Sequence, residues 1–290
     1  MTALMPEGPV REEVAEGSGL RTRRTRTVAV IGVLGVAVAA VVVAGGALRP
    51  AAELTDLLAQ RRPPGWAHPF GTDWLGRDML ARTLVGLRTS LLVGMGAAGI
   101  SAAIALVLAG VSTLGRWADA VVGWLVDLFL ALPHLILILL IAFALGGGLQ
   151  AVIVAVAVTH WPSLTRVLRA EARRVMSSDY VQIARRLGKG GGWIMTRHLG
   201  RHLFGHFTVG MVLLFPHAIL HEAGLSFLGM GLSPHSPAIG VILADSMRYL
   251  SGGAWWLALL PGFALLVLVK TVDVIGEQVR ALTDPRSVHE

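Results

Sequence analysis

Six ionisable side chains lie within or beside long apolar stretches of this 290-residue sequence. An Asp, Lys or Arg at the centre of a membrane-spanning helix costs roughly 2.5–3.5 kcal/mol on insertion scales, so a polar residue at that depth is a functional candidate by default. Imidazole and carboxylate groups in such positions are suited to line a polar path or to bind a cation for a short time. The six candidates are Asp127, His134, His160, His217, His221 and Glu222.

Two of these histidines have the spacing of a shared ligand site. His217 and His221 are four residues apart, which places both on one face of a helix. Neutral imidazole is a good ligand for Ni²⁺, but a site that conducts an ion must also release it. We therefore expect transient rather than firm metal binding at this pair. The alternative for each histidine is a packing role, with a hydrogen bond to a neighbouring helix or to a tightly held water.

Hydrolytic chemistry is not indicated by the same residues. His221-Glu222 begins like the His-Glu-x-x-His helix of zinc proteases, but Leu225 stands where the second histidine would be. The sequence also has no Gly-x-Ser-x-Gly elbow and no cysteine, which removes serine and thiol nucleophiles and any disulfide framework. An intramembrane enzyme is only a distant alternative.

The apolar stretches themselves predict an all-α membrane protein with about six transmembrane helices. Hydrophobic residues make up 54% of the chain, charged residues only 15%, and the mean hydropathy is +0.67, far from the balance of soluble domains. A helix that crosses the hydrocarbon core needs about 20 apolar residues. The predicted spans are residues 28–48, 91–112, 120–145, 149–165, 203–223 and 254–275.

Basic residues orient these spans with both termini in the cytoplasm. Nine Lys or Arg residues lie between spans four and five, within residues 166–202, and cytoplasmic loops carry such an excess. The same loops explain the net charge of +7 without nucleic-acid binding. The first outer connection contains six arginines, which is contrary to this rule. We nevertheless expect the orientation with both termini in the cytoplasm. The predicted organisation is a cytoplasmic polar tail (1–27), a first transmembrane helix (28–48), an extracytoplasmic connection (49–90), a transmembrane core (91–275) and a cytoplasmic tail (276–290).

The basic segment between spans four and five predicts a compact cytoplasmic hairpin. A short helix is expected to begin near Asp179 and to end at Gly188, because glycine suits the left-handed C′ position. A second short helix is expected from Trp193 to His202. On charge alone, this hairpin could equally lie on anionic lipid or dock a partner protein.

Three stretches, in order along the chain, carry a family resemblance. Gly71-Thr72-Asp73-Trp74-Leu75-Gly76-Arg77-Asp78 precedes the second span, Gln182-Ile183-Ala184 with Gly188 lies in the basic hairpin, and Glu222-Ala223-Gly224-Leu225-Ser226-Phe227-Leu228-Gly229 follows the fifth span. The ending, with Gly276-Glu277 and Asp284-Pro285-Arg286, is similar as well. Together these stretches resemble the permeases of ATP-binding-cassette importers of the dipeptide/oligopeptide/nickel family, and the long segment before span two resembles the second of the two permease types.

The resemblance implies a transport subunit, not an enzyme, in the inner membrane. The chain has no Gly-x-x-x-x-Gly-Lys-Ser/Thr phosphate loop, so we expect it to bind no cofactor and expect ATP and Mg²⁺ on separate ATP-binding subunits. The family's assembly further implies a second permease subunit, an extracytoplasmic substrate-binding protein and membrane lipid as partners. It assigns contact with the ATPase to a coupling loop at about residues 170–202, with Tyr180, Gln182, Ala184, Gly188 and Arg197. Arg201 departs from the pattern, which has proline there.

The substrate expectation also rests on the resemblance. Thr159-His160-Trp161 and the spacing of His217 and His221 look more like the nickel branch of the family than the peptide branch. We therefore expect nickel or a metal chelate to be translocated by alternating access. Import of dipeptides or oligopeptides is the alternative.

Overall fold

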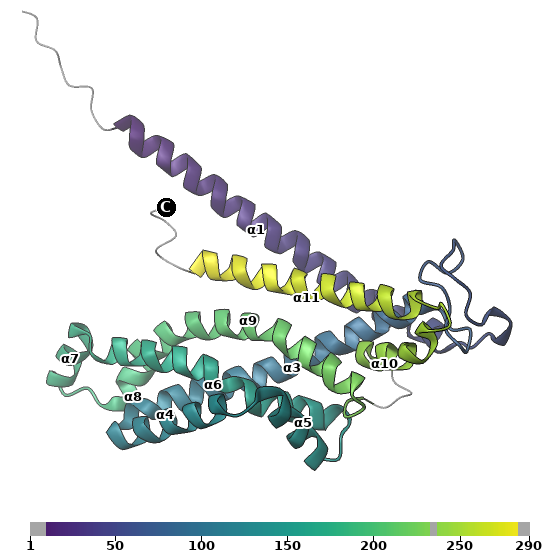
Figure 1. Ribbon diagram of the computed structural model, residues 1–290. Helices are drawn as coiled ribbons and strands as arrows, with labels where there is room; N and C mark the ends of the chain where they lie inside the picture. The colour runs from purple at the N-terminus through teal and green to yellow at the C-terminus, as the bar shows by residue number, and fades with distance from the viewer. Residues whose placement is uncertain (1–9, 233–236, 284–290) are drawn as a thin grey trace, which may run out of the picture.

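The computed structural model describes residues 10–232 and 237–283, and they are predominantly helical (Figure 1). The described residues form no β-strand, and one isolated bridge joins Thr72 to Asp78. The all-α class predicted from the sequence is confirmed. The elements in chain order are α1 (Val10–Ala47), α2 (Arg49–Glu53), η1 (Leu57–Ala59), α3 (Met79–Val111), η2 (Ser112–Leu114), α4 (Arg116–Ala131), α5 (His134–Ala144), α6 (Gly148–Met176), α7 (Asp179–Arg186), α8 (Gly191–Ile194), the π-helical turn η3 (Met195–Leu199), α9 (Gly200–Phe227), α10 (Ile239–Leu250) and α11 (Trp256–Thr283).

Five helical segments are long and apolar enough to cross a membrane, and a sixth span is bent. The bent span is the pair α4 and α5, whose axes differ by 95° across a short break. Counted as one span, this pair brings the total to the predicted six. The five continuous segments are Arg24–Ala47, Met79–Leu114, Gly148–Met176, Gly191–Phe227 and Trp256–Thr283.

The break between α4 and α5 corrects the prediction of one continuous helix over residues 120–145. Pro133 has no backbone N–H, and its ring disfavours helical backbone at the residue before it. Leu132 accordingly has extended dihedral angles, φ −79° and ψ 143°. The apolar run continues through this point, so hydropathy alone did not reveal the bend.

Most helices extend beyond the apolar stretches that predicted them. α3 begins at Met79, because the Asp78 carboxylate accepts a hydrogen bond from the backbone N–H of Ala81 at 2.8 Å and so caps the helix. The last part of the predicted connection 49–90 is therefore helical. Likewise α1 begins within the predicted tail 1–27, and α11 occupies part of the predicted tail 276–290. Asp284-Pro285-Arg286 lies outside the described residues.

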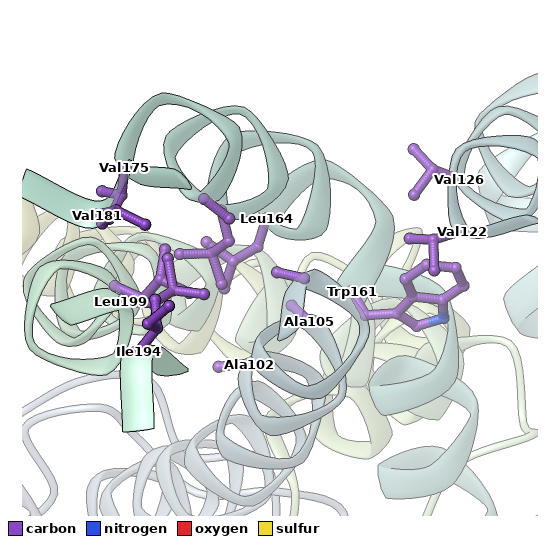
Figure 2. Close-up of a cluster of buried hydrophobic side chains, with 14 residues drawn as sticks. Ala102, Ala105, Val122, Val126, Trp161, Leu164, Val175, Val181, Ile194 and Leu199 are labelled. Atoms are coloured by element: carbon purple, nitrogen blue, oxygen red, sulfur yellow. The ribbon is translucent and has the colours of Figure 1, made fainter. Parts of the chain in front are cut away.

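Small residues allow the spans to pack closely. Ala102, Ala105 and Ala109 form a fully buried stripe on α3, within a cluster to which α4, α6 and α9 also contribute (Figure 2). Such residues let helix backbones approach one another in a membrane, where packing rather than the hydrophobic effect favours association. A side chain at Gly94 would collide with Ile219 of α9, since its Cβ would lie 2.7 Å from Ile219 Cγ1.

α1 lies at the edge of the bundle, beside α11 (Figure 1). Its C-terminal end packs tightly on α3, because a Cβ at Gly45 would lie 2.5 Å from the carbonyl oxygen of Leu84. Along the span itself most side chains are exposed. The core that positions the candidate functional residues is therefore built by α3, α4, α5, α6 and α9, with α10 and α11 packed against it.

Candidate functional site

The helix α7 rests on the end of the span bundle, where α6 ends and α8 begins (Figure 1). It is amphipathic, and its apolar side is buried against the chain's own core. Val181 is fully buried and packs in the same cluster as Leu199 of η3 and Leu168 of α6 (Figure 2). This base fixes the position of α7 relative to the two long helices on either side of it.

The opposite side of α7 is exposed and carries large apolar side chains among polar and charged ones. Tyr180, Ile183 and Leu187 of this loop, together with Trp193 of α8, expose 42%, 57%, 73% and 42% of their surfaces. We call these four residues the coupling face. Large apolar side chains exposed outside the spans point to a candidate protein-interaction site. Basic residues adjoin it, and the Lys189 ammonium lies 5.3 Å from the centre of the Trp193 ring.

The first predicted turn of the hairpin forms as expected. Gly188 has φ +76° and follows α7, and the N–H of Lys189 donates to the carbonyl of Ala184 at 3.1 Å. These are the features of a left-handed glycine cap. The side-chain amide of Gln182 donates to the carbonyl of Met176 at 3.0 Å, which ties α7 back to the end of α6.

The residues assigned to the coupling loop do not all face outward. Tyr180, Gln182, Gly188 and Arg197 are exposed, whereas Ala184 is only 7% exposed and faces the core. The side chain of Ala184 thus packs α7 against the core and is not part of the coupling face.

The expected second short helix, from Trp193 to His202, is not separate from the fifth span. α8, η3 and α9 follow without interruption as one helical segment, Gly191–Phe227. Arg201 stands where the family pattern has proline, and an arginine retains the N–H that helical hydrogen bonding requires. The fifth span consequently begins well before residue 203.

Paired charges hold the loop end of α6 against α4. Arg169 Nε lies 2.5 Å from Asp119 Oδ1, and Arg169 Nη2 donates to the Asp119 carbonyl at 2.7 Å. Arg173 makes a second ion pair with the same carboxylate. Two of the nine basic residues of this region are therefore structural.

Three of the six polar candidates come together between different helices. His134 is the first residue of α5, His160 lies in the middle of α6, and His221 lies near the end of α9. The ring centres of each pair are 4.6 to 5.0 Å apart. The Nε2 atoms of His134 and His160 are 3.4 Å apart.

The other candidates are not members of this group of three. His217 is exposed and is not part of this group, so the partners of His221 are His134 and His160. Asp127 is 74% exposed, and its carboxylate pairs with Arg166 at 2.8 Å. Neither residue lies with the three histidines on a shared buried path.

Glu222 is fully buried near the end of α9 and is hydrogen-bonded to the next turn of the same helix. Its Oε1 accepts a hydrogen bond from Ser226 Oγ at 2.9 Å. Gly231 and Gly240 pack so closely on Ser226 that neither has room for a side chain. The arrangement fits a structural role for this carboxylate at the junction of α9 and α10.

A buried ionic network at the start of α3 was not recognised as a site from the sequence. Asp73 is fully buried, and its Oδ2 accepts from Arg77 Nε at 2.7 Å and from Arg82 Nη1. Trp74 stacks on Tyr249 of α10 at 5.1 Å. The Gly71–Asp78 motif carries part of this signal, but a second span that begins at residue 91, as hydropathy predicts, places Arg82 in a loop.

Comparisons with known proteins agree with this architecture. Residues 89–284 match the family model described as "Binding-protein-dependent transport system inner membrane component", which is more than half of the chain. A "Putative peptide permease protein" of Brucella suis biovar 1 is 39% identical over 236 residues, covering 80% of this chain and 78% of the relative. The "Dipeptide transport system permease protein DppC" of Bacillus subtilis is 32% identical over 232 residues, covering 80% and 72%.

Proposed function

The chain belongs to the family of binding-protein-dependent transport system inner membrane components, and from that membership we propose that it is a permease subunit that imports short peptides. As a member of this family it is a multi-pass inner-membrane transport component and not an enzyme. The peptide substrate, the partners and the orientation are the parts that we propose.

The coupling face carries the proposal that ATP-binding subunits drive this permease. Four large apolar side chains are exposed on α7 and the start of α8, and the other side of α7 is fixed in the core. A rigid apolar surface of this kind is suited to receive a groove of a partner protein. ATP and Mg²⁺ would be bound by that partner, and this chain would transmit its movement.

The basic residues around α7 favour a cytoplasmic position for this helix and for both termini. Nine basic residues lie in residues 166–202, as in cytoplasmic loops. The opposite end of the bundle, with residues 54–78 and α10, would then face an extracytoplasmic binding protein. Leu58 and Trp66 are almost fully exposed at that end and are suited to such a contact. The second permease subunit would pack against the spans.

We propose peptides rather than nickel as the substrate. The sequence favoured nickel or a metal chelate because of a few histidines. Three relatives, two from Brucella suis biovar 1 and one from Bacillus subtilis, are named as peptide or dipeptide permeases. These names support the peptide alternative. Of the predicted pair, His217 is exposed and is not one of the three histidines grouped around His221.

Movement would pass from the coupling face into the spans through α6 and α9. Both helices contribute to the cluster that contains Val181, and both continue across the bundle. A push on α7 therefore acts on two spans at once. Closure and opening of the path between the spans would follow as alternating access.

A charge on the coupling face tests the proposal. We expect Ile183→Asp and Leu187→Asp, in the complete importer reconstituted in vesicles, to reduce uptake of a radiolabelled dipeptide at least about tenfold, since a buried unpaired charge weakens an interface strongly. Leu282→Asp is the matched control, because Leu282 is an exposed apolar residue at the end of α11. Equal uptake by all three variants would contradict the role of this face.

Transport by the same vesicles decides the substrate. We expect unlabelled dipeptides to compete with the labelled dipeptide, and we expect radioactive Ni²⁺ without peptide to accumulate no faster than in vesicles without ATP. ATP-dependent accumulation of Ni²⁺ with no dipeptide uptake would restore the nickel alternative.

A further inference from the structure

We propose that His134, His160 and His221 form a site for one divalent transition-metal ion of the Zn²⁺ or Ni²⁺ class, which links α5 to α6 and α9. This site is distinct from the predicted pair of His217 and His221, and it goes beyond peptide import. All three residues offer a ligand nitrogen, and these atoms lie within 4.8 Å of one another.

The spacing of the nitrogens approaches that of a tetrahedral metal site. Bonds of about 2.0–2.1 Å from a metal to imidazole nitrogens at tetrahedral angles place two such nitrogens about 3.3–3.4 Å apart. Nε2 of His134 and Nε2 of His160 are already 3.4 Å apart. The ligand nitrogen of His221 lies within 4.8 Å of the other two, so each distance has to shorten by at most about 1.4 Å to reach the tetrahedral spacing.

The hydrogen bonds of His160 leave the correct nitrogen free to bind a metal. His160 Nδ1 lies 2.8 Å from the carbonyl oxygen of Val156. A carbonyl only accepts, so Nδ1 carries the hydrogen and Nε2 keeps its lone pair. Metal-binding histidines are oriented in this way by a backbone carbonyl on the second nitrogen. The lone pair of His160 Nε2 is directed to the space shared with His134.

The backbone around the three histidines is held by packing. His160 is itself buried, and His221 is followed by the fully buried Glu222. Below His134, Ile138 and Ala142 of α5 are buried in one cluster with residues of α3, α6 and α9. Ligands on packed helices are positioned more rigidly than ligands on loops.

The donor set selects the class of ion. Imidazole nitrogens suit Zn²⁺, Ni²⁺ and Cu²⁺, whereas Mg²⁺ and Ca²⁺ take oxygen ligands. Three protein ligands leave a coordination position for water. Because the ligands come from three helices, a bound ion opposes their relative movement. If the proposed function is correct, the ion would hold α6 and α9 in one arrangement and slow import.

Metal titration of the purified chain tests the site. The protein is prepared in lipid nanodiscs with a tag that lacks histidine, is freed of metal with a chelator, and is titrated with Ni²⁺ in a calorimeter. We expect one ion per chain. Loss of an outer-shell partner already weakens metal sites by 10–100-fold, so His134→Ala, His160→Ala and His221→Ala should each weaken binding by at least about 100-fold.

His217→Ala is the matched control, because His217 lies on the same helix as His221 but outside the group. We expect it to bind Ni²⁺ like the unaltered protein, and we expect Ni²⁺ to raise the melting temperature of both. The three ligand variants should melt normally in chelator and show no rise with Ni²⁺. No binding to the unaltered protein, or equal weakening by His217→Ala, would overturn the site.

A transport measurement tests the metal site separately from the proposed function. In vesicles that import a dipeptide, Zn²⁺ is expected to slow uptake by the unaltered importer and not by the importer with His160→Ala. Vesicles that bind the ion but take up no dipeptide would refute the proposed substrate and leave the metal site supported. Equal inhibition of both proteins would refute the link between the site and transport.

Discussion

At the scale of single residues, Asp73 shows how buried charge is accommodated at the end of the span bundle. Its Oδ1 accepts from the backbone N–H of Leu75 and of Arg77 at 2.8 and 2.9 Å, and its Oδ2 accepts from two arginines. A buried carboxylate with this many donors is fully satisfied. The network joins the loop before α3 to the helix itself, because Arg82 lies within α3.

We predict that Asp73→Asn lowers the free energy of unfolding by about 3–5 kcal/mol, since it leaves the buried guanidinium of Arg82 without its counter-ion. Unfolding by denaturant in micelles, followed by tryptophan fluorescence, measures the change. Asp127→Asn is the matched control, because Asp127 is exposed and its pair with Arg166 lies at the surface. Equal stability of the two variants would show that the buried network is dispensable.

The six polar candidates show how far residue types alone can predict a site. The sequence marks His134, His160 and His221 as candidates because each is polar in an apolar setting. Which of the histidines meet depends on the bend at Pro133 and on the packing of α6 against α9, and no local pattern reports either. His217 shares a helix face with His221 in the sequence, yet it is exposed and is not one of the three histidines that meet.

At the scale of elements, two loops depend on glycine for different reasons. Gly76 has φ +73° and lies so close to the carbonyl of Asp56 that a Cβ would overlap it. Gly253 has φ +83° but has no atom within 4 Å of the position of a Cβ. The first glycine is required by conformation and by contact, and the second by conformation alone.

We predict that Gly253→Ala destabilises the protein by about 1–2 kcal/mol, the usual cost of left-handed backbone for a residue with a Cβ. Gly76→Ala should cost roughly 1–3 kcal/mol more, because the methyl group must also displace the loop that contains Asp56. The same denaturant titration compares the two. Similar losses would mean that the loop before α3 yields easily to a side chain.

The elements also differ in how well the sequence predicts them. The end of α7 at Gly188 was predicted because a glycine cap is a local signal. The start of α3 was missed by twelve residues, because hydropathy marks where a helix meets lipid and not where its hydrogen bonds begin. Asp78 is the cap that shows this start, and its side chain was available in the sequence as a signal.

At the scale of the whole molecule, the orientation in the membrane is open to a direct experiment, because the chain has no cysteine. We predict that the cysteine introduced by Trp66→Cys reacts with a membrane-impermeant maleimide in intact spheroplasts. A cysteine at Leu187→Cys should react only after permeabilisation. Both positions are exposed in the structure, so access from either side is not limited by packing. The opposite labelling pattern would invert the proposed topology.

The number of spans and the helical class were predicted from composition and apolar runs, which report burial in lipid directly. The long-range contacts were not. α1 was predicted as an ordinary span, but the structure has it at the edge of the bundle, where only its C-terminal end packs tightly on α3. That position leaves a long apolar surface free for lipid or for a second permease subunit.

The continuous helical segment from Gly191 to Phe227 has a mechanical consequence. With a rise of about 1.5 Å per residue, its 37 residues form a rod of roughly 55 Å. A tilt of about 5° around its centre would displace each end by roughly 2–3 Å. The end beside the coupling face and the end that carries His221 would then swing in opposite directions, with Pro216 between them as the point where the segment can bend instead.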